Sequence, residues 1–329
     1  MSQEQVLVCD EVPEFFLSAL REMNFAVDYQ PGISYESVLK EIGRFNGVMI
    51  RSSLLIDAAV IENAEKLKFI LRPGSGLDNI DVEAATHSGI TIINSPEGNR
   101  NAVAEHTAGL LLSLLNNISQ ASREVRQMKW QREENRGWEL AGKVVGLVGY
   151  GNTGSSFGQK LMGFDVEVIA YDKYKSGFSD SVAHQVDLED IFERADVLSL
   201  HIPLNRETYH FINAEFIAKF KKPFYLLNTS RGKNVNTKDL LDAVEQGKVL
   251  GAALDVLENE DLESYSQEEK ALLQRVINNG KILITPHIAG WTFESKQKIF
   301  STLIDKLKIH LANPEEVKEI MMNPGEDDA

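Results

Sequence analysis

Short runs of β-branched and other apolar residues alternate along the chain with longer segments of helical periodicity. In the first hundred residues, apolar runs occur at 6–9, 26–29, 48–50, 69–71 and 91–93. A second series occurs at 144–148, 166–170, 197–203, 224–232, 249–256 and 282–286. Such alternation is typical of parallel sheets covered by helices on both faces. The pattern therefore predicts an α/β fold with two doubly wound parallel sheets.

The length of the chain and the order of these elements predict two domains. A chain of 329 residues is long for a single hydrophobic core. A turn-rich crossing at 94–101 precedes a long helical pattern at 102–128, and a boundary is expected near its start. The helical pattern at 295–311 is expected to return to the first domain. The first predicted domain is discontinuous and comprises 1–100 and 291–329, and the second is continuous and comprises 101–290.

A glycine-rich turn, GYGNTG at 149–154, joins the first run of the second series to a helical segment. The order of strand, glycine turn, helix and strand is that of a Rossmann dinucleotide-binding unit. Gly149 would allow the tight turn, Gly151 would let the backbone approach a pyrophosphate, and Gly154 would allow close packing of helix and strand. Asp172 ends the second strand, where a carboxylate can accept hydrogen bonds from both ribose hydroxyls and repel a 2′-phosphate. The sequence therefore predicts an NAD site, with NAD favoured over NADP.

Composition restricts the possible partners. The net charge of −15 argues against general binding to nucleic acid or to an anionic membrane surface, because both draw on basic patches. No apolar stretch is long enough to span a bilayer, and no signal peptide is visible, so a cytoplasmic protein is expected. The single cysteine lies in an apolar run and the seven histidines lack ligand spacing, so neither a disulfide nor a metal site is expected.

Distinctive polar residues follow four runs of the second series. They are His201, Arg231, Asp255 with Glu260 after it, and His287. Together with the glycine turn, the motifs HIPL, NTSRG, GAALDV and TPHIAG resemble those of the D-isomer-specific 2-hydroxyacid dehydrogenase family, in the same order and over nearly the whole chain. The segments RPGSGLDNID and NSPEGNRNAVAEHT look most like the D-3-phosphoglycerate dehydrogenase branch, in a short form without a regulatory domain.

The resemblance implies a Rossmann NAD-binding domain inserted in a flavodoxin-like substrate domain. It implies hydride transfer between NAD and a D-2-hydroxy acid, with 3-phosphoglycerate as the favoured substrate and serine biosynthesis as the setting. The alternatives are a glyoxylate or hydroxypyruvate reductase and an NAD-sensing interaction protein similar to corepressors built on this scaffold. A homodimer is expected, although the helix at 102–128 serves equally well as an internal brace or as a contact with a second subunit.

Reduction of a 2-keto acid builds charge on the carbonyl oxygen, so the site needs a proton donor and a cation. His287 is the expected acid, because imidazole titrates near neutrality and serves both directions of the reaction. Glu260, paired with it, would favour the imidazolium, although Asp261 stands where the family usually has proline. Arg231 has a guanidinium suited to the substrate carboxylate and carbonyl. By resemblance, these are the family's catalytic residues.

The resemblance also assigns residues that bind the cofactor and the substrate. For the cofactor, it adds to the glycines and Asp172 the following positions: Asn152, Thr153, His201, Ile202, Pro203, Thr229, Ser230, Asp255, Ala289 and Gly290. The family more often has a basic residue and isoleucine at positions 152 and 153, so a weaker phosphate contact is expected. For the substrate, the positions are Ser75, Gly76 and Asn79 at the carboxylate, and Arg51 at a phosphate with help from Arg72 or Arg132.

Overall fold

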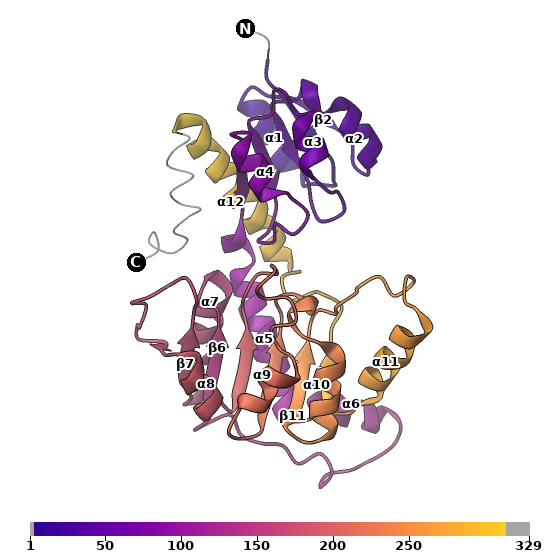
Figure 1. Cartoon of the computed structure of the whole chain (residues 1–329), viewed down its shortest axis with the longest axis vertical. Helices are drawn as coiled ribbons and strands as arrows, with labels where there is room; N and C mark the ends of the chain where they lie inside the picture. Colours follow the sequence, from indigo (N-terminus) through magenta and orange to yellow (C-terminus); the bar gives the residue numbers. More distant parts are fainter. Residues whose placement is uncertain (1–2, 314–329) are drawn as a thin grey trace. The chain divides into compact units, whose positions relative to one another are not determined.

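The computed structural model describes residues 3–313, and its residues form two compact units (Figure 1). The first unit contains the described residues up to Asn99 together with those from Phe293 onward, and the second unit is Arg100–Thr292. The remaining residues of the discontinuous domain expected from the sequence, 1–2 and 314–329, lie outside the described part of the chain.

The first unit is built on a five-stranded parallel sheet with the order β2-β1-β3-β4-β5. Its strands are β1 (Gln5–Val8), β2 (Ala26–Tyr29), β3 (Gly47–Met49), β4 (Phe69–Arg72) and β5 (Thr91–Asn94). This order is that of flavodoxin-like doubly wound sheets, whose ligand sites lie at the carboxyl ends of the strands. The fold expected for this part of the chain is therefore confirmed.

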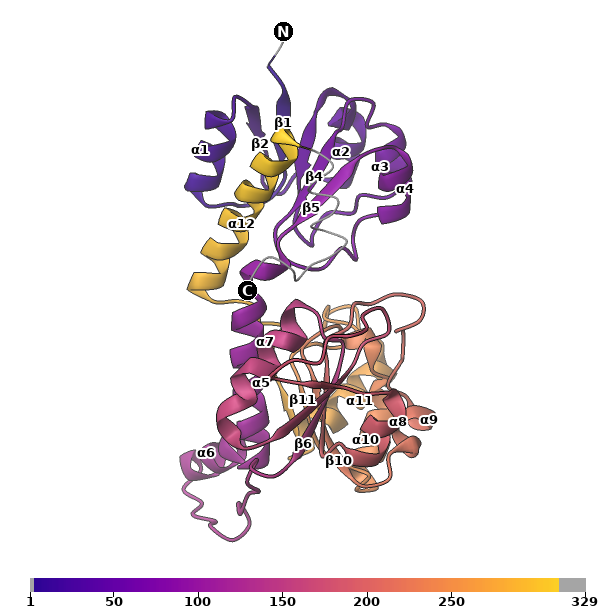
Figure 2. The same ribbon diagram turned by 90° about the vertical axis from the view of Figure 1, so that its left-hand side faces the viewer.

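Helices cover both faces of the first sheet, as its apolar strands require. They are α1 (Glu14–Glu22), α2 (Tyr35–Glu41), α3 (Ala58–Glu62), α4 (Val82–His87) and α12 (Phe293–Ala312), with 3-10 turns η1 (Ile42–Arg44) and η2 (Pro96–Gly98). On one face α1 and α12 pack together, with the rings of Phe16 and Phe300 5.1 Å apart. The other face carries α2, α3 and α4 (Figure 2). Side chains of Ser34, Asp57 and Asp81 cap the starts of these three helices.

The second unit is built on a seven-stranded parallel sheet with the order β12-β11-β10-β9-β6-β7-β8. Its strands are β6 (Val144–Val148), β7 (Glu167–Tyr171), β8 (His184–Gln185), β9 (Val197–Leu200), β10 (Phe224–Asn228), β11 (Val249–Leu254) and β12 (Ile282–Ile284). The chain starts at β6, runs to the edge at β8 and returns to β9 on the other side of β6. This reversal between β6 and β9 is the switch point at which Rossmann folds bind dinucleotides.

The second unit has seven helices, and all except α6 contribute buried side chains to the core around its sheet. They are α5 (Arg100–Leu115), α6 (Ile118–Arg126), α7 (Asn152–Leu161), α8 (Leu188–Arg194), α9 (Ala214–Lys219), α10 (Thr237–Glu245) and α11 (Gln267–Asn278), with 3-10 turns η3 (Met162–Phe164) and η4 (Gly232–Asn234). Figure 2 shows α5 and α7 on one side of the sheet and α8 to α10 on the other. In residues 3–313, no helix combines the length and apolar character needed to cross a membrane.

The prediction of a single helix at 102–128 is wrong in one respect, because the segment forms two helices, α5 and α6. Asn117, between them, has φ 52°, a left-handed conformation that asparagine tolerates better than most residues. The break turns Ile118 away from the buried leucines of α5, and its side chain is 54% exposed. The periodicity therefore continues in the sequence across a position where the backbone changes direction.

Candidate active site

The glycine turn after β6 leaves room for a ligand to approach the protein backbone. Gly149 has φ 95°, and a Cβ there would lie 2.4 Å from the carbonyl oxygen of His201. A Cβ on Gly154 would lie 2.2 Å from the oxygen of Gly149, whereas one on Gly151 would meet nothing within 4 Å. No side chain caps the start of α7, which begins at Asn152. The first and third glycines are required by packing, and the second, beside an uncapped helix start, fits a pyrophosphate.

The carboxylate of Asp172 is fixed at the end of β7 by three backbone N–H groups. Tyr150 donates to Oδ2 at 2.8 Å, and Tyr174 and Lys175 donate to Oδ1 at 2.9 and 3.1 Å. An ionised carboxylate offers about four acceptor positions. The backbone donors therefore hold Asp172 beside the glycine turn and leave acceptor capacity for a ribose hydroxyl.

Asp255 anchors the loop that follows β12. Its side chain is 1% exposed. Its oxygens accept hydrogen bonds from Thr285 Oγ1 at 2.6 Å, from the N–H of Ile288 at 3.0 Å and from the N–H of Ala289 at 2.8 Å. Burial alone would raise the pKa of Asp255, but these bonds and one from His106 hold the pKa below its ordinary value. A buried carboxylate that stays charged thus positions the whole segment around residue 287.

His287 and Glu260 form a hydrogen-bonded pair. Nδ1 of His287 donates to Oε2 of Glu260 at 2.8 Å, and the backbone N–H of His287 donates to the oxygen of Asp255 at 2.7 Å. His287 has φ 54°, a strained conformation that is typical of functional positions. The bond to Glu260 raises the pKa of His287, although burial and the positive charge of Arg231 oppose this.

The segment at Arg231 is held by Asn228, which is fully buried at the end of β10. The Asn228 amide donates to the oxygen of Arg231 at 2.9 Å and accepts bonds from the N–H and the hydroxyl of Ser230. A Cβ on Gly232 would lie 1.8 Å from the oxygen of Leu257. The loop after β11 therefore passes directly against Gly232, the residue that follows Arg231.

Sequence reasoning missed a second histidine–carboxylate pair in the same loop. Oε2 of Glu258 lies 2.6 Å from Nε2 of His210, and its Oε1 accepts from the N–H of Thr237 at 2.7 Å. Glu258, two residues before Glu260, therefore ties the loop to the start of α10. The sequence shows two glutamates in ENE, but their spacing alone does not say which one faces His287.

The other cofactor-side predictions cluster along the same sheet edge. Nε2 of His201 lies 2.9 Å from the hydroxyl of Ser199, and burial lowers the pKa of His201 to about 3. This histidine is thus neutral near pH 7 and unsuited to the role of acid, as expected. The hydroxyl of Thr229 lies 3.1 Å from that of Thr107. The predicted positions at the carboxyl ends of β9, β10 and β12, in chain order, are His201, Ile202 and Pro203, Thr229 and Ser230, and Ala289 and Gly290.

The predicted substrate residues lie in the first unit, at the carboxyl ends of β3 and β4. The side-chain amide of Asn79 donates to the oxygen of Arg51 at 2.7 Å, and Nε of Arg72 donates to Oδ1 of Asn79 at 3.4 Å. Asn94 donates to the oxygen of Ser75 at 3.0 Å, which holds the loop that contains Gly76. Asn79 therefore connects the two arginine-bearing segments.

Arg132, the other arginine considered for a substrate phosphate, lies in the second unit. It is exposed in the segment before β6, at the amino-terminal edge of that sheet. The glycine turn lies at the opposite edge, so the structure favours the alternative of a surface arginine. Among residues 3–313, no group of three or more histidine, cysteine, aspartate or glutamate side chains is arranged to hold a metal ion.

These features define the second unit as the dinucleotide-binding domain of an oxidoreductase. The family model described as D-isomer specific 2-hydroxyacid dehydrogenase, NAD binding domain, matches residues 108–289. The chain belongs to the D-isomer-specific 2-hydroxyacid dehydrogenase family, as the sequence motifs indicated. Its cofactor is NAD, and it is an oxidoreductase of the NAD-dependent D-2-hydroxyacid dehydrogenase class.

Relatives with different substrates are about equally similar to this chain. It is 35% identical over 272 residues to hydroxypyruvate reductase from Thermotoga maritima. This match covers 83% of this chain and 87% of that protein. It is 34% identical over 297 residues to D-3-phosphoglycerate dehydrogenase from Archaeoglobus fulgidus. This match covers 90% of this chain but 55% of that protein. The structure of D-lactate dehydrogenase from Aquifex aeolicus complexed with NAD and lactic acid superposes with a TM-score of 0.81, at 26% identity, over 95% of this chain and 97% of that one.

Proposed function

We propose that this protein interconverts a D-2-hydroxy acid and its 2-keto acid by means of His287, Glu260 and Arg231, with D-3-phosphoglycerate as the favoured substrate. The observation that carries the proposal is the 2.8 Å bond between His287 and Glu260, which keeps a proton on an imidazole at the edge of the sheet. The similarity to D-3-phosphoglycerate dehydrogenases supports the substrate, and serine biosynthesis in the cytoplasm is the setting that goes with it.

The roles of the residues follow from their contacts. NAD, when bound, supplies the hydride acceptor for oxidation and, in reduced form, the donor for reduction. Because Nδ1 of His287 donates to Glu260, Nε2 is the nitrogen left to exchange a proton with the substrate oxygen. Arg231 would hold the substrate carboxylate and stabilise the charge that develops on the carbonyl oxygen. Asp255 positions the histidine by holding its loop.

On the substrate side, we propose that the loop at Ser75 and Gly76 receives the carboxylate and that Arg51, with Arg72, receives a phosphate. Arginine forks suit phosphate oxygens, and Asn79 holds both arginine-bearing segments in place. The second candidate is hydroxypyruvate or glyoxylate reduction, because the hydroxypyruvate reductase relative matches over most of its own length. These two candidates differ in whether the substrate carries a phosphate.

A panel of keto acids tests the proposal. Oxidation of NADH would be measured with phosphohydroxypyruvate, hydroxypyruvate, glyoxylate and pyruvate. The highest kcat/KM is expected with phosphohydroxypyruvate, and Arg51→Gln should raise its KM while that for hydroxypyruvate stays unchanged. A preference for hydroxypyruvate or glyoxylate would favour the second candidate. Absence of turnover with every compound would contradict catalysis on 2-keto acids of this kind.

Replacing Glu260 by glutamine is expected to move the alkaline limb of the pH profile of reduction to lower pH. The hydrogen bond to Glu260 raises the pKa of His287, so the imidazolium persists above its ordinary range and is lost as pH rises through the raised value. Loss of the negative charge lowers that pKa, so the acid is lost earlier on the alkaline side. The measurement is kcat for reduction between about pH 5 and pH 9, where histidine titrates. Glu263→Gln, at an exposed position in the same loop, is the control, and a profile identical to that of the wild type would show that Glu260 is not the partner during turnover.

We also propose that the protein is a homodimer. Large apolar side chains are exposed along α6 and the segment after it, namely those of Ile118, Val125, Met128, Trp130 and Trp138. Exposed apolar clusters of this kind mark association surfaces. Light scattering should give twice the chain mass of 36.8 kDa, and Met128→Glu should reduce it toward that of a monomer. Met162→Glu, at an exposed methionine outside the cluster, should leave the mass unchanged, and a monomeric wild type would refute the proposal.

A further inference from the structure

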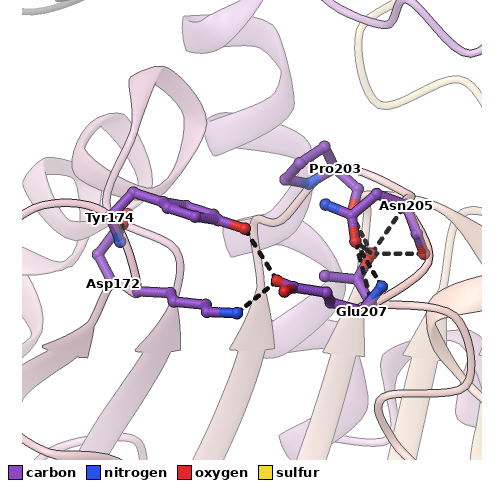
Figure 3. A network of polar contacts seen from close by, with 7 residues as sticks. Asp172, Tyr174, Pro203, Asn205 and Glu207 are labelled. Atoms are coloured by element: carbon purple, nitrogen blue, oxygen red, sulfur yellow. Dashed lines mark hydrogen bonds and ion pairs between the residues drawn. The ribbon is translucent and has the colours of Figure 1, made fainter.

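Three side chains form a clasp beside Asp172, which we define as Lys173, Tyr174 and Glu207. The Tyr174 hydroxyl donates to Oε2 of Glu207 at 3.0 Å, and Nζ of Lys173 donates to the same oxygen (Figure 3). All three side chains are more than half exposed, so their mutual contacts contribute little to the stability of the fold. Their effect would therefore lie in what the surface can bind.

The clasp joins two segments that lie on opposite sides of the glycine turn. Lys173 and Tyr174 follow β7, whereas Glu207 follows β9, and these strands flank β6 on its two sides. Since all three strands are parallel, their carboxyl ends lie on one edge. The clasp therefore connects the loops on either side of the end of β6, next to Asp172 at the end of β7.

Both ends of the clasp are held by the backbone. Oδ1 of Asn205 accepts from the N–H groups of Glu207 and Thr208, at 2.9 and 3.0 Å, and the Thr208 hydroxyl donates to the oxygen of Pro203 at 2.7 Å (Figure 3). On the other side, the N–H of Tyr174 is bound to Asp172. Glu207 is thus presented by an ordered turn, and Lys173 is the residue next to the ribose-binding aspartate.

We propose that Glu207 is a determinant of cofactor specificity, because it engages Lys173 and so denies that ammonium to the 2′-phosphate of NADP. An ammonium beside the ribose would be a good partner for a 2′-phosphate, as lysine is a common phosphate ligand. When Glu207 is paired with Lys173, a 2′-phosphate would lie beside the negative charge of Asp172 without a compensating cation. Hydrogen bonds from Lys173 and Tyr174 lower the pKa of Glu207, so its carboxyl stays charged near neutral pH.

A double-mutant cycle tests this role by calorimetric titration of the whole protein with NADH and with NADPH. Glu207→Gln should tighten NADPH binding by about three- to tenfold, within the range of a charge-assisted contact at an exposed site, and should change NADH binding by less than about twofold. When Lys173→Gln is added, the gain for NADPH should vanish, since it requires the released ammonium. Tyr174→Phe removes only the neutral donor and should alter neither affinity.

Two outcomes would overturn the proposal. If Glu207→Gln tightens NADPH binding equally with and without Lys173, the effect is general repulsion of an anion and not engagement of the lysine. If both affinities are unchanged, the clasp has no role in specificity. The inference depends on NAD binding and not on the proposed substrate, and affinity is measured without turnover. A protein that fails every keto-acid assay would therefore still allow this test.

Discussion

Replacing His287 by alanine is expected to lower kcat for keto-acid reduction by about 10²- to 10⁴-fold, which is the usual contribution of a general acid. In the proposed mechanism, Nε2 of His287 delivers the proton that neutralises the developing alkoxide, and the bond from Nδ1 to Glu260 raises the pKa of the imidazole. The loop that carries it is held by Asp255 through backbone contacts that do not involve the imidazole. The Kd for NADH should therefore stay near that of the wild type.

Steady-state kinetics and NADH titration on the same preparation separate these two effects. His184→Gln, at an exposed histidine on the edge strand β8, is the matched control and should retain full activity. If turnover by His287→Ala stays within a few-fold of the wild type, another residue must be the general acid. Loss of NADH affinity together with turnover would instead indicate a collapsed loop.

Replacing Arg231 by glutamine is expected to lower kcat/KM for the keto acid by about 10²- to 10³-fold, comparable with loss of one group that stabilises an oxyanion. The guanidinium would contact the substrate carboxylate and carbonyl, so both binding and the chemical step should suffer. Lysine at this position should restore only part of the activity, because an ammonium lacks the planar fork. Arg231 also influences His287, so loss of its charge should raise the pKa of the histidine.

The measurements are kcat and KM for the keto acid, and the Kd for NADH. Arg275→Gln, which removes an exposed ion pair with Glu245, is the control for loss of one arginine charge. A variant at position 231 with unchanged keto-acid kinetics would contradict its assignment as the substrate cation. An effect confined to the affinity for NADH would assign the arginine to the cofactor.

The sequence was sufficient for the fold because its signals are local. Most of the strands are short, largely buried apolar runs, and Gly149 and Gly154 are each required by a contact within a few ångströms. The helix break at Asn117 was missed because hydrophobic periodicity continues past it, and only the left-handed backbone reverses the face. Apolar spacing reports which residues are able to share a face, not whether the chain stays straight.

The sequence by itself determined the succession of strands along the chain except β8, the dinucleotide turn and the identity of the histidine and arginine that follow particular strands. Only the tertiary structure decided that Glu260 faces His287 while Glu258 faces His210, because the loop crosses Gly232 and is tied down at Thr237. The clasp at Glu207 likewise joins residues more than thirty positions apart along the chain. Such pairings arise when separate strand ends meet at one edge of a sheet, and spacing along a single chain does not encode which side chains meet there.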